Sequence, residues 1–235
     1  MNNRGLKQLV LFFLLFLSAF ASQAGVIDDL KKISSVYSSF ESFGMNLTYS
    51  AYAEEEDRIP KSVQQGSFMH CSKGDYLQVG EMETYVTTSF KILVDKTSKL
   101  LAVFSPDKKP ISPLNFDITV DLCDKIDVLD LKENCKGYKF IFKEKIDDEI
   151  RSITIVFNRD SYLIQKAIIQ YKNTGMKIDG LTQQPRLEVS YFNYNTRPSV
   201  PQNFFSLERF ITGKADAMKP SMEFKGFTTI DSRNQ

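Results

Sequence analysis

The stretch SITIVFNRDSYLIQKAIIQYKN, residues 152–173, carries two apolar segments on either side of a polar turn. In the first segment Ile153, Ile155 and Phe157 alternate with polar residues, which is the period of a β-strand with one buried face. The second segment has apolar side chains on both faces of a second strand. The stretch therefore predicts a β-hairpin, with its turn at 158–161, in a sheet that is covered on both sides or nearly so.

The same period of two recurs along most of the chain, and charged or proline-rich loops separate the segments. One such loop, EEEDRIPKS at 54–62, has the composition of a solvated turn. The segment 116–122 fits either a strand or a helix, and its β-propensity favours the strand. We expect the remaining strands near 43–53, 64–71, 75–79, 82–88, 90–95, 99–105, 127–131, 137–144, 150–158, 162–172 and 186–194.

The segment VIDDLKKISSVYSSF, residues 26–40, has a helical period instead. Asp28 and Asp29 fall in its first turn, where acidic side chains suit the helix dipole. A membrane-surface helix would carry more basic and bulkier apolar side chains. The pattern predicts an amphipathic helix packed on a sheet, and the whole chain an α+β, mainly β fold with one large curved antiparallel sheet. The apolar side of the helix consists of Val26, Ile27, Leu30, Ile33, Tyr37 and Phe40.

The N-terminus has the pattern of a secretory signal peptide. Arg4 and Lys7 precede the apolar run LVLFFLLFL at 9–17, which is shorter than the roughly 20 residues of a membrane span. Small residues follow, and we expect cleavage after Ala21 or, as the second choice, after Ala24. The expected product is soluble and periplasmic. The chain then divides into a signal peptide at 1–21, one domain at 22–212 and a C-terminal tail at 213–235 that wraps the sheet edge or is loose.

Composition excludes several classes of protein. The 30 basic and 29 acidic residues leave a net charge of +1, so no general field attracts nucleic acid. In an exported chain, the short polar segment between Cys123 and Cys135 predicts a disulfide, with Cys71 left reduced. One histidine and no C-x-x-C spacing argue against a metal site, and no cofactor is expected.

Enzyme motifs are also missing from the sequence. It contains no G-x-S-x-G elbow and no H-E-x-x-H pair. The single histidine, His70, is next to Cys71, but neighbouring residues of a strand point to opposite faces and cannot form a Cys–His nucleophile. We therefore expect no catalytic residues.

Four segments follow one another in a characteristic order: the first helix leading into FGMNLTYSAY, then SFKILVDKTSKLLAVFSP, ITIVFNRDSYLIQKAIIQYKNTG and LEVSYFNYNTRPSVPQNFFSL. This order resembles the LolA/LolB-like superfamily of periplasmic lipoprotein carriers and their relatives. The resemblance covers roughly residues 26–211 and implies an unclosed β-barrel around an apolar cavity, with the helix packed on its concave face. In that family the cavity holds the acyl chains of lipoproteins.

The chain departs from the carriers at one strand. Where they have a basic-proline-aromatic stretch, this sequence reads SFMHCSKGDYLQVG, residues 67–80, without an arginine. Arg58 lies upstream in a charged loop and does not take over the gating role of the family's arginine. The chain also lacks tryptophan. The resemblance therefore implies the fold and a lipid-type cavity rather than lipoprotein transport in particular.

Two functional interpretations remain. In the first, the chain is an exported binding protein, a periplasmic carrier or envelope-biogenesis factor, that holds a lipid, acyl chain or acylated protein in the half-open barrel. Each buried CH₂ contributes about 0.8 kcal/mol, so such a site needs no polar motif. Its apolar lining would be Met45, Leu47, Tyr49, Phe140, Phe142, Ile153, Ile155, Phe157, Leu187 and Val189.

In the second interpretation, the chain is a non-catalytic interaction protein of an envelope or secretion assembly. The barrel would then be filled by large side chains of its own, with Tyr138, Phe140, Phe142 and Phe157 on the inner face. Neither interpretation involves nucleic acid or a membrane-spanning segment.

Overall fold

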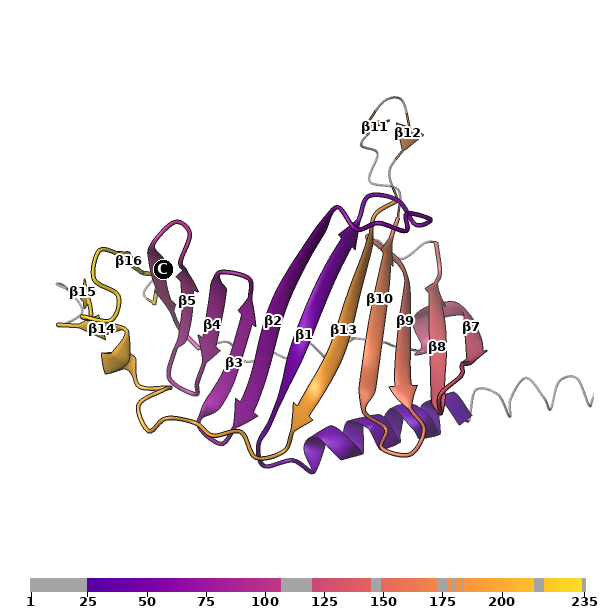
Figure 1. The fold of residues 1–235 in the computed structure, drawn as a ribbon, viewed down its shortest axis with the longest axis horizontal. Helices are drawn as coiled ribbons and strands as arrows, with labels where there is room; N and C mark the ends of the chain where they lie inside the picture. The colour runs from indigo at the N-terminus through magenta and orange to yellow at the C-terminus, as the bar shows by residue number, and fades with distance from the viewer. Residues whose placement is uncertain are drawn as a thin grey trace, which may run out of the picture.

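The computed structural model describes residues 25–106, 120–144, 149–172, 177–178, 181–182, 184–213 and 218–233. A helix at 25–38 is followed almost entirely by strands (Figure 1). The strands are β1 Phe43–Tyr52, β2 Ser62–Cys71, β3 Gly74–Val79, β4 Met82–Val86, β5 Lys91–Asp95, β6 Leu100–Phe104, β7 Cys123–Asp130, β8 Cys135–Phe142, β9 Ile150–Asn158, β10 Ile164–Tyr171, β11 Lys177–Ile178, β12 Leu181–Thr182, β13 Arg186–Asn195, β14 Ile211–Thr212, β15 Lys219–Pro220 and β16 Thr228–Asp231.

Twelve of these strands form one sheet in the order β16-β6-β5-β4-β3-β2-β1-β13-β10-β9-β8-β7. All neighbouring pairs are antiparallel except β16 and β6. β16 and β7 lie at opposite edges, so the sheet curves without closing (Figure 1). The predicted fold class, a mainly β chain with one large curved sheet and an N-terminal helix, is confirmed.

The opening stretch forms β9 and β10 as predicted. The side chain of Asn158 stabilises the turn because its Oδ1 atom accepts hydrogen bonds from the backbone N–H groups of Asp160 and Ser161, both at 3.0 Å. Ser152 and Thr154, on the face away from the helix, are buried as well. The strand prediction for 116–122 is wrong at Val120–Leu122, which forms a 3₁₀ turn, and residues 116–119 lie outside the described ranges.

The helix packs on one face of β1, β13, β10, β9 and β8, across the end of these strands that is lowest in Figure 1. We call the resulting cluster the helix-side core. It consists of Val26, Ile33, Phe43, Met45, Leu47, Phe68, Tyr138, Phe140, Ile153, Ile155, Phe157, Ile164, Ala167, Val189 and Tyr191.

A second core lies on the opposite face of the same sheet. In β2, Phe68 belongs to the helix-side core whereas its neighbour Met69 packs in the second cluster, and successive strand residues point to opposite faces. The second cluster covers β4, β5 and β6 with residues 204–227, of which 214–217 are outside the description. This C-terminal core consists of Tyr85, Phe90, Ile92, Val94, Leu101, Val103, Phe205, Phe210, Ile211 and Phe224.

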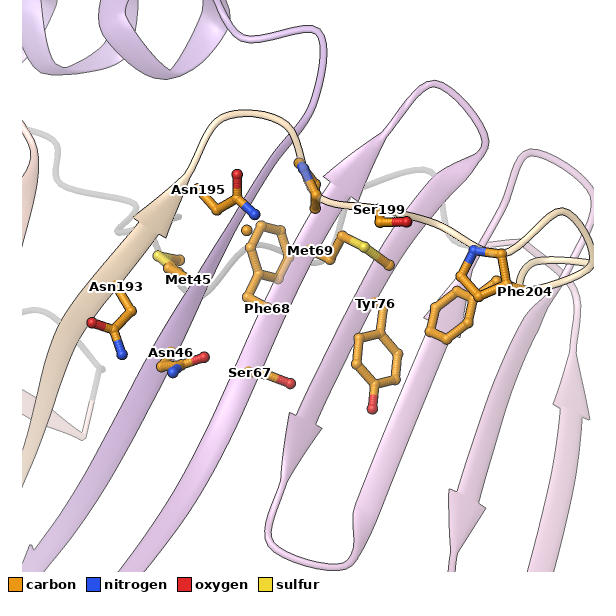
Figure 2. Close-up of a pocket in the computed structure, with 13 residues that line it drawn as sticks. Met45, Asn46, Ser67, Phe68, Met69, Tyr76, Asn193, Asn195, Ser199 and Phe204 are labelled. Atoms are coloured by element: carbon orange, nitrogen blue, oxygen red, sulfur yellow. The ribbon is translucent and has the colours of Figure 1, made fainter.

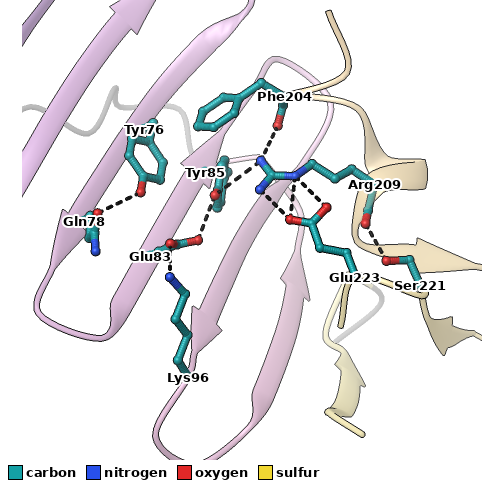
Figure 3. A network of polar contacts seen from close by, with 9 residues as sticks. All are labelled: Tyr76, Gln78, Glu83, Tyr85, Lys96, Phe204, Arg209, Ser221 and Glu223. Atoms are coloured by element: carbon teal, nitrogen blue, oxygen red, sulfur yellow. Dashed lines mark hydrogen bonds and ion pairs between the residues drawn. The ribbon is translucent and has the colours of Figure 1, made fainter. Parts of the chain in front are cut away.

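A polar network closes the C-terminal core at one side (Figure 3). The Glu83 carboxylate, 7% exposed, accepts a hydrogen bond from the Tyr85 hydroxyl at 2.8 Å and pairs with Lys96 at 2.6 Å. Arg209 pairs with Glu223 at 2.7 Å and reaches the Tyr85 hydroxyl at 3.5 Å. Burial, with the hydrogen bond to Glu83, raises the pKa of Tyr85, so its hydroxyl remains a donor at neutral pH.

The predicted tail is part of this arrangement. Residues 219–220 pair with β14, and β16 adds to the sheet edge parallel to β6. Phe224 is buried in the C-terminal core. The described part of 213–235 therefore wraps the edge of the sheet, one of the two forms that the sequence suggested.

The predicted disulfide does not fit this fold, in which none of the three cysteines is joined to another by a disulfide. Cys123 begins β7 opposite Phe142, the last residue of β8, whereas Cys135 is the first residue of β8. Seven strand positions at about 3.3 Å each separate the two ends of β8 by roughly 23 Å. A disulfide requires Cα atoms closer than about 7 Å. The prediction was wrong because it treated a short interval in sequence as closeness in space. The chain runs the full length of β7 after Cys123 before it turns back to Cys135.

Candidate functional site

The ten residues predicted to line an apolar site lie on one face of the sheet, the face that the helix covers. Cross-strand register establishes this directly. Residues directly opposite one another on neighbouring strands form rows across the sheet. One row runs from Tyr49 through Val189, Ala167 and Ile155 to Tyr138. The next row runs from Ala51 through Leu187, Ile169, Ile153 and Phe140 to Ile126.

Burial divides the ten residues into two groups. Seven of them are at most 5% exposed, namely Met45, Leu47, Phe140, Ile153, Ile155, Phe157 and Val189. The other three, Tyr49, Phe142 and Leu187, are half-buried against the same core. Phe142 ends β8 and Leu187 is near the start of β13, whereas the helix contacts the start of β8 at Lys136 and the end of β13 at Tyr194. Tyr49, paired with Val189, likewise lies in the later half of β1, away from the helix. The apolar face is therefore sealed near the helix and less closely covered at its far end.

A cavity of about 850 Å³ opens at this far end, next to Phe142. Its volume is within the range of about 300–1,000 Å³ typical of small-molecule sites. Three cationic and two anionic side chains surround its apolar part. The lining consists of Asp124, Ile141, Phe142, Lys143, Glu144, Arg151, Lys172 and Gln184.

The cations at the cavity differ in how their charge is balanced. Arg151 donates to the Glu55 carboxylate at 2.9 Å and to the Gln184 side chain at 3.3 Å. Lys143 donates to the backbone carbonyl of Asp121 at 2.7 Å, and no ion pair joins it to a described carboxylate, although Asp124 and Glu144 line the same cavity. A ligand with an anionic end and an apolar body matches the arrangement of Lys143 beside Phe142.

The sequence did not reveal these polar residues. Lys143, Arg151 and Lys172 come from three separate segments, and only the pairing of β8, β9 and β10 brings them together. The charged loop was also misread as a solvated turn. Its Glu55 accepts a hydrogen bond from buried Gln170 at 2.6 Å, in addition to the ion pair with Arg151. Loops have no periodic pattern of apolar residues, so the sequence does not show that a loop residue contacts a distant strand.

The helix is held in place by polar contacts at both ends. Near its start, Asp29 Oδ2 accepts hydrogen bonds from Lys136 and from Tyr138. Near its end, the hydroxyl groups of Tyr37 and Tyr194 lie 2.9 Å apart, and Tyr37 accepts the backbone N–H of Ile164 at 3.0 Å. Burial raises the pKa of both tyrosines, so they remain protonated. These contacts fix the helix over one end of the apolar face.

His70 and Cys71 point to opposite sides of the sheet, as predicted. His70 lies beside Phe43, with ring centres 5.7 Å apart, whereas Cys71 packs against the C-terminal core. His70 Nδ1 is 2.6 Å from the carboxylate of Asp75, which is buried. Burial raises the pKa of Asp75, while the hydrogen bond from His70 opposes that shift. Among the described residues, no group of three His, Cys, Asp or Glu side chains converges as metal ligands would.

Membrane-spanning helices are missing from the described part of the chain, where no helix has the length and apolar content that a bilayer crossing demands.

No family model and no curated protein matches this chain. Solved structures do match it. An uncharacterized conserved protein from Thermus thermophilus is 7% identical, with 88% of this chain and 99% of that chain covered and a TM-score of 0.48. The Mycobacterium tuberculosis lipoprotein LppX is also 7% identical, with 76% and 99% covered and a TM-score of 0.42.

A third match is a putative outer membrane lipoprotein-sorting protein domain from Vibrio parahaemolyticus, 10% identical, with 76% of this chain and 95% of that chain covered and a TM-score of 0.34. These structures include proteins of the kind that the sequence resemblance indicated. The TM-scores of these three structures are below 0.5, so their likeness carries no argument about function. That argument rests on the apolar face and its cavity.

Proposed function

We propose that this chain is an exported, non-catalytic binding protein that holds a lipid or acyl chain on the helix-covered face of its open sheet. The ligand's apolar body would lie along the far half of that face. Its polar end would lie at the cavity beside Phe142, where the ammonium group of Lys143 would pair with an anionic group.

The observation that carries this proposal is the continuity between the apolar face and the cavity. The row through Leu187, Ile169, Ile153 and Phe140 lies next to Phe142, which follows Phe140 by two positions in β8. Phe142 packs against the helix-side core and also lines the cavity. Each buried CH₂ contributes about 0.8 kcal/mol of favourable binding free energy. Ten methylenes therefore contribute roughly 8 kcal/mol, before the cost of immobilising the ligand chain is subtracted. Hydrocarbon contact alone would therefore give useful affinity without a polar motif.

The alternative function is an interaction protein with a filled interior, within an envelope or secretion assembly. The close burial of the seven residues near the helix favours it. Leu47 is fully buried, so Leu47→Phe should cost about 1–3 kcal/mol by overpacking under either interpretation. A change at Phe142, which is half-buried and lines the cavity, is the one that separates the two functions.

The test is native mass spectrometry of the protein purified from its own envelope without detergent, followed by titration with a fluorescent C16 fatty acid. We expect a bound mass of lipid size and saturable binding of the probe. Phe142→Trp should weaken binding at little cost in stability, because it fills the cavity without adding charge.

Phe192→Trp serves as the matched control, because Phe192 is an exposed aromatic residue on the polar face of β13. It should leave binding unchanged. If neither lipid nor probe binds the native protein, the filled-barrel interaction protein is the better description. If Phe192→Trp weakens binding as much as Phe142→Trp does, the cavity is not the site.

A further inference from the structure

A second hollow lies on the other face of the sheet, away from the helix. It measures about 380 Å³ and is bounded by β1, β2, β3 and β13 and by the loop that enters the C-terminal segment. Figure 2 shows carboxamide groups gathered toward one end of it and the ring of Phe204 at the other. We call it the asparagine groove, after Asn46, Asn193 and Asn195.

A β-bulge in β13 builds one end of this groove. The register between β1 and β13 shifts between Gly44 and Asn46, where the partners change from Asn195 to Phe192. Asn193, in the extra position, has φ of 53°, a left-handed conformation that is uncommon for a residue other than glycine. A bulge redirects side chains that strict alternation would send to the other face. Asn193 therefore lines the same groove as Asn195, while Tyr194 packs on the helix-side core.

The chemistry of the groove is polar but neutral. Each of its three carboxamides offers one acceptor oxygen and two N–H donors. Within the described residues, only Asn195 of the three has its amide engaged, accepting the backbone N–H of Arg197 at 2.9 Å. Ser67 and Ser199 add hydroxyl groups, and none of the described residues that line the groove carries a charge. These residues offer no counter-charge to an anionic or cationic ligand.

The apolar end of the groove consists of ring edges and a thioether. Tyr76 and Phe204 meet edge to face with centroids 5.1 Å apart, and Met69 lies next to them. Burial raises the pKa of Tyr76 to about 12, so its hydroxyl stays neutral, and it donates a hydrogen bond to the Gln78 side chain at 3.1 Å. Apolar ring edges at one end and amides at the other suit a ligand that presents both C–H surfaces and many hydroxyl groups.

We propose that the asparagine groove binds a neutral carbohydrate. An extended peptide is the other neutral polar ligand of this size. Peptides bind sheets by adding a strand at a free edge, whereas β1, β2 and β13 are each paired on both sides. Recognition must then come from side chains, and carboxamides next to aromatic edges match vicinal sugar hydroxyls. The proposal goes beyond lipid binding and does not depend on it.

The test uses the full-length mature protein on an array of immobilised neutral oligosaccharides, with titration calorimetry of the strongest binder in free form. Asn193→Gly is the informative variant because glycine keeps the left-handed backbone and removes only the amide. We expect it to weaken binding about tenfold, the effect of one lost hydrogen bond to a ligand. Asn46→Ala should act similarly, and the double variant should lose the array signal.

Asn203→Ala is the control, since Asn203 is exposed in the same loop and does not line the groove. It should bind as the native protein does. The proposal is overturned if no oligosaccharide binds, or if Asn193→Gly binds as well as Asn203→Ala, which would leave the bulge a purely structural feature. Binding to an array of neutral peptides, lost in the same variants, would assign the groove to peptide and also overturn it.

Discussion

The hydroxyl group of Tyr138 donates a hydrogen bond of 2.6 Å to the carboxylate of Asp29, although 109 positions of the chain separate the two residues. Lys136 donates to the same oxygen at 2.8 Å. The first turn of the helix is thereby joined to the start of β8. Asp29 was expected to act on the helix dipole, and its position in the first turn is compatible with that role. Its direct partners, however, belong to a distant strand.

Removing the charge of Asp29 should loosen the helix from the sheet. Asp29→Asn weakens two hydrogen bonds to a carboxylate, and we expect a loss of about 1.5–3 kcal/mol in the free energy of unfolding. Urea denaturation measures it. Asp28→Asn is the control because Asp28 is exposed in the same turn, and it should change stability by less than about 0.5 kcal/mol. Equal effects of the two substitutions would mean that the contacts with β8 contribute nothing specific.

The contribution of Asp29 should also depend on pH. Burial would raise the pKa of this carboxyl, but the hydrogen bonds from Lys136 and Tyr138 outweigh burial and lower the pKa below its ordinary value of 3.8. A group whose pKa is lowered on folding stabilises the folded state above its unfolded pKa and loses that effect as the pH falls through the folded pKa. The stability difference between the native protein and Asp29→Asn should therefore be constant near neutrality and shrink below about pH 4. A difference that persists unchanged to pH 2 would contradict this assignment.

Arg209 should hold the C-terminal segment on the sheet. Its guanidinium bonds to Glu223 and to the carbonyl oxygen of Phe204, and it lies over the ring of Tyr85. Arg209 is 16% exposed and Glu223 is 49% exposed, so the carboxylate can be solvated when its partner is removed. Arg209→Met should therefore cost about 1–3 kcal/mol and expose the segment to limited proteolysis. Arg197→Met, at an exposed arginine, should do neither.

The three cysteines should titrate as thiols in protein isolated from an oxidising compartment and unfolded without reductant. The distance between the ends of β8 keeps Cys123 and Cys135 apart. Burial also raises the pKa of Cys123, which disfavours its reactive thiolate form at neutral pH. Thiol counting and peptide mapping check this, with Cys71→Ser as a calibration that should lower the count by one. Recovery of a peptide pair linked through Cys123 and Cys135 would contradict the register of β7 and β8.

The spacing of apolar residues in the sequence determined where the helix and most of the strands lie. The helical spacing from Val26 to Phe40 predicted the helix, and alternation predicted β1–β6, β8–β10 and β13 to within a few residues. Because the side-chain period of a strand is two, the sequence also identified the ten apolar residues that share one face. Segments without a dominant period were predicted less well. Residues 120–122 form a 3₁₀ turn, and the Glu55 loop binds the polar face of the sheet.

The tertiary structure alone decided what covers each face and where space remains. Alternation tells which residues of a strand lie together, but each sheet face is covered by segments remote in sequence. The helix covers one face at Tyr138, and the segment around Arg209 covers the other at Tyr85. The same limit applies to the cavity at Phe142 and to the groove at Asn193, whose linings come from strands paired across the sheet. Strands are predicted from the alternation of apolar and polar residues. A bulge interrupts that alternation, so the side chain that it redirects cannot be predicted from the sequence.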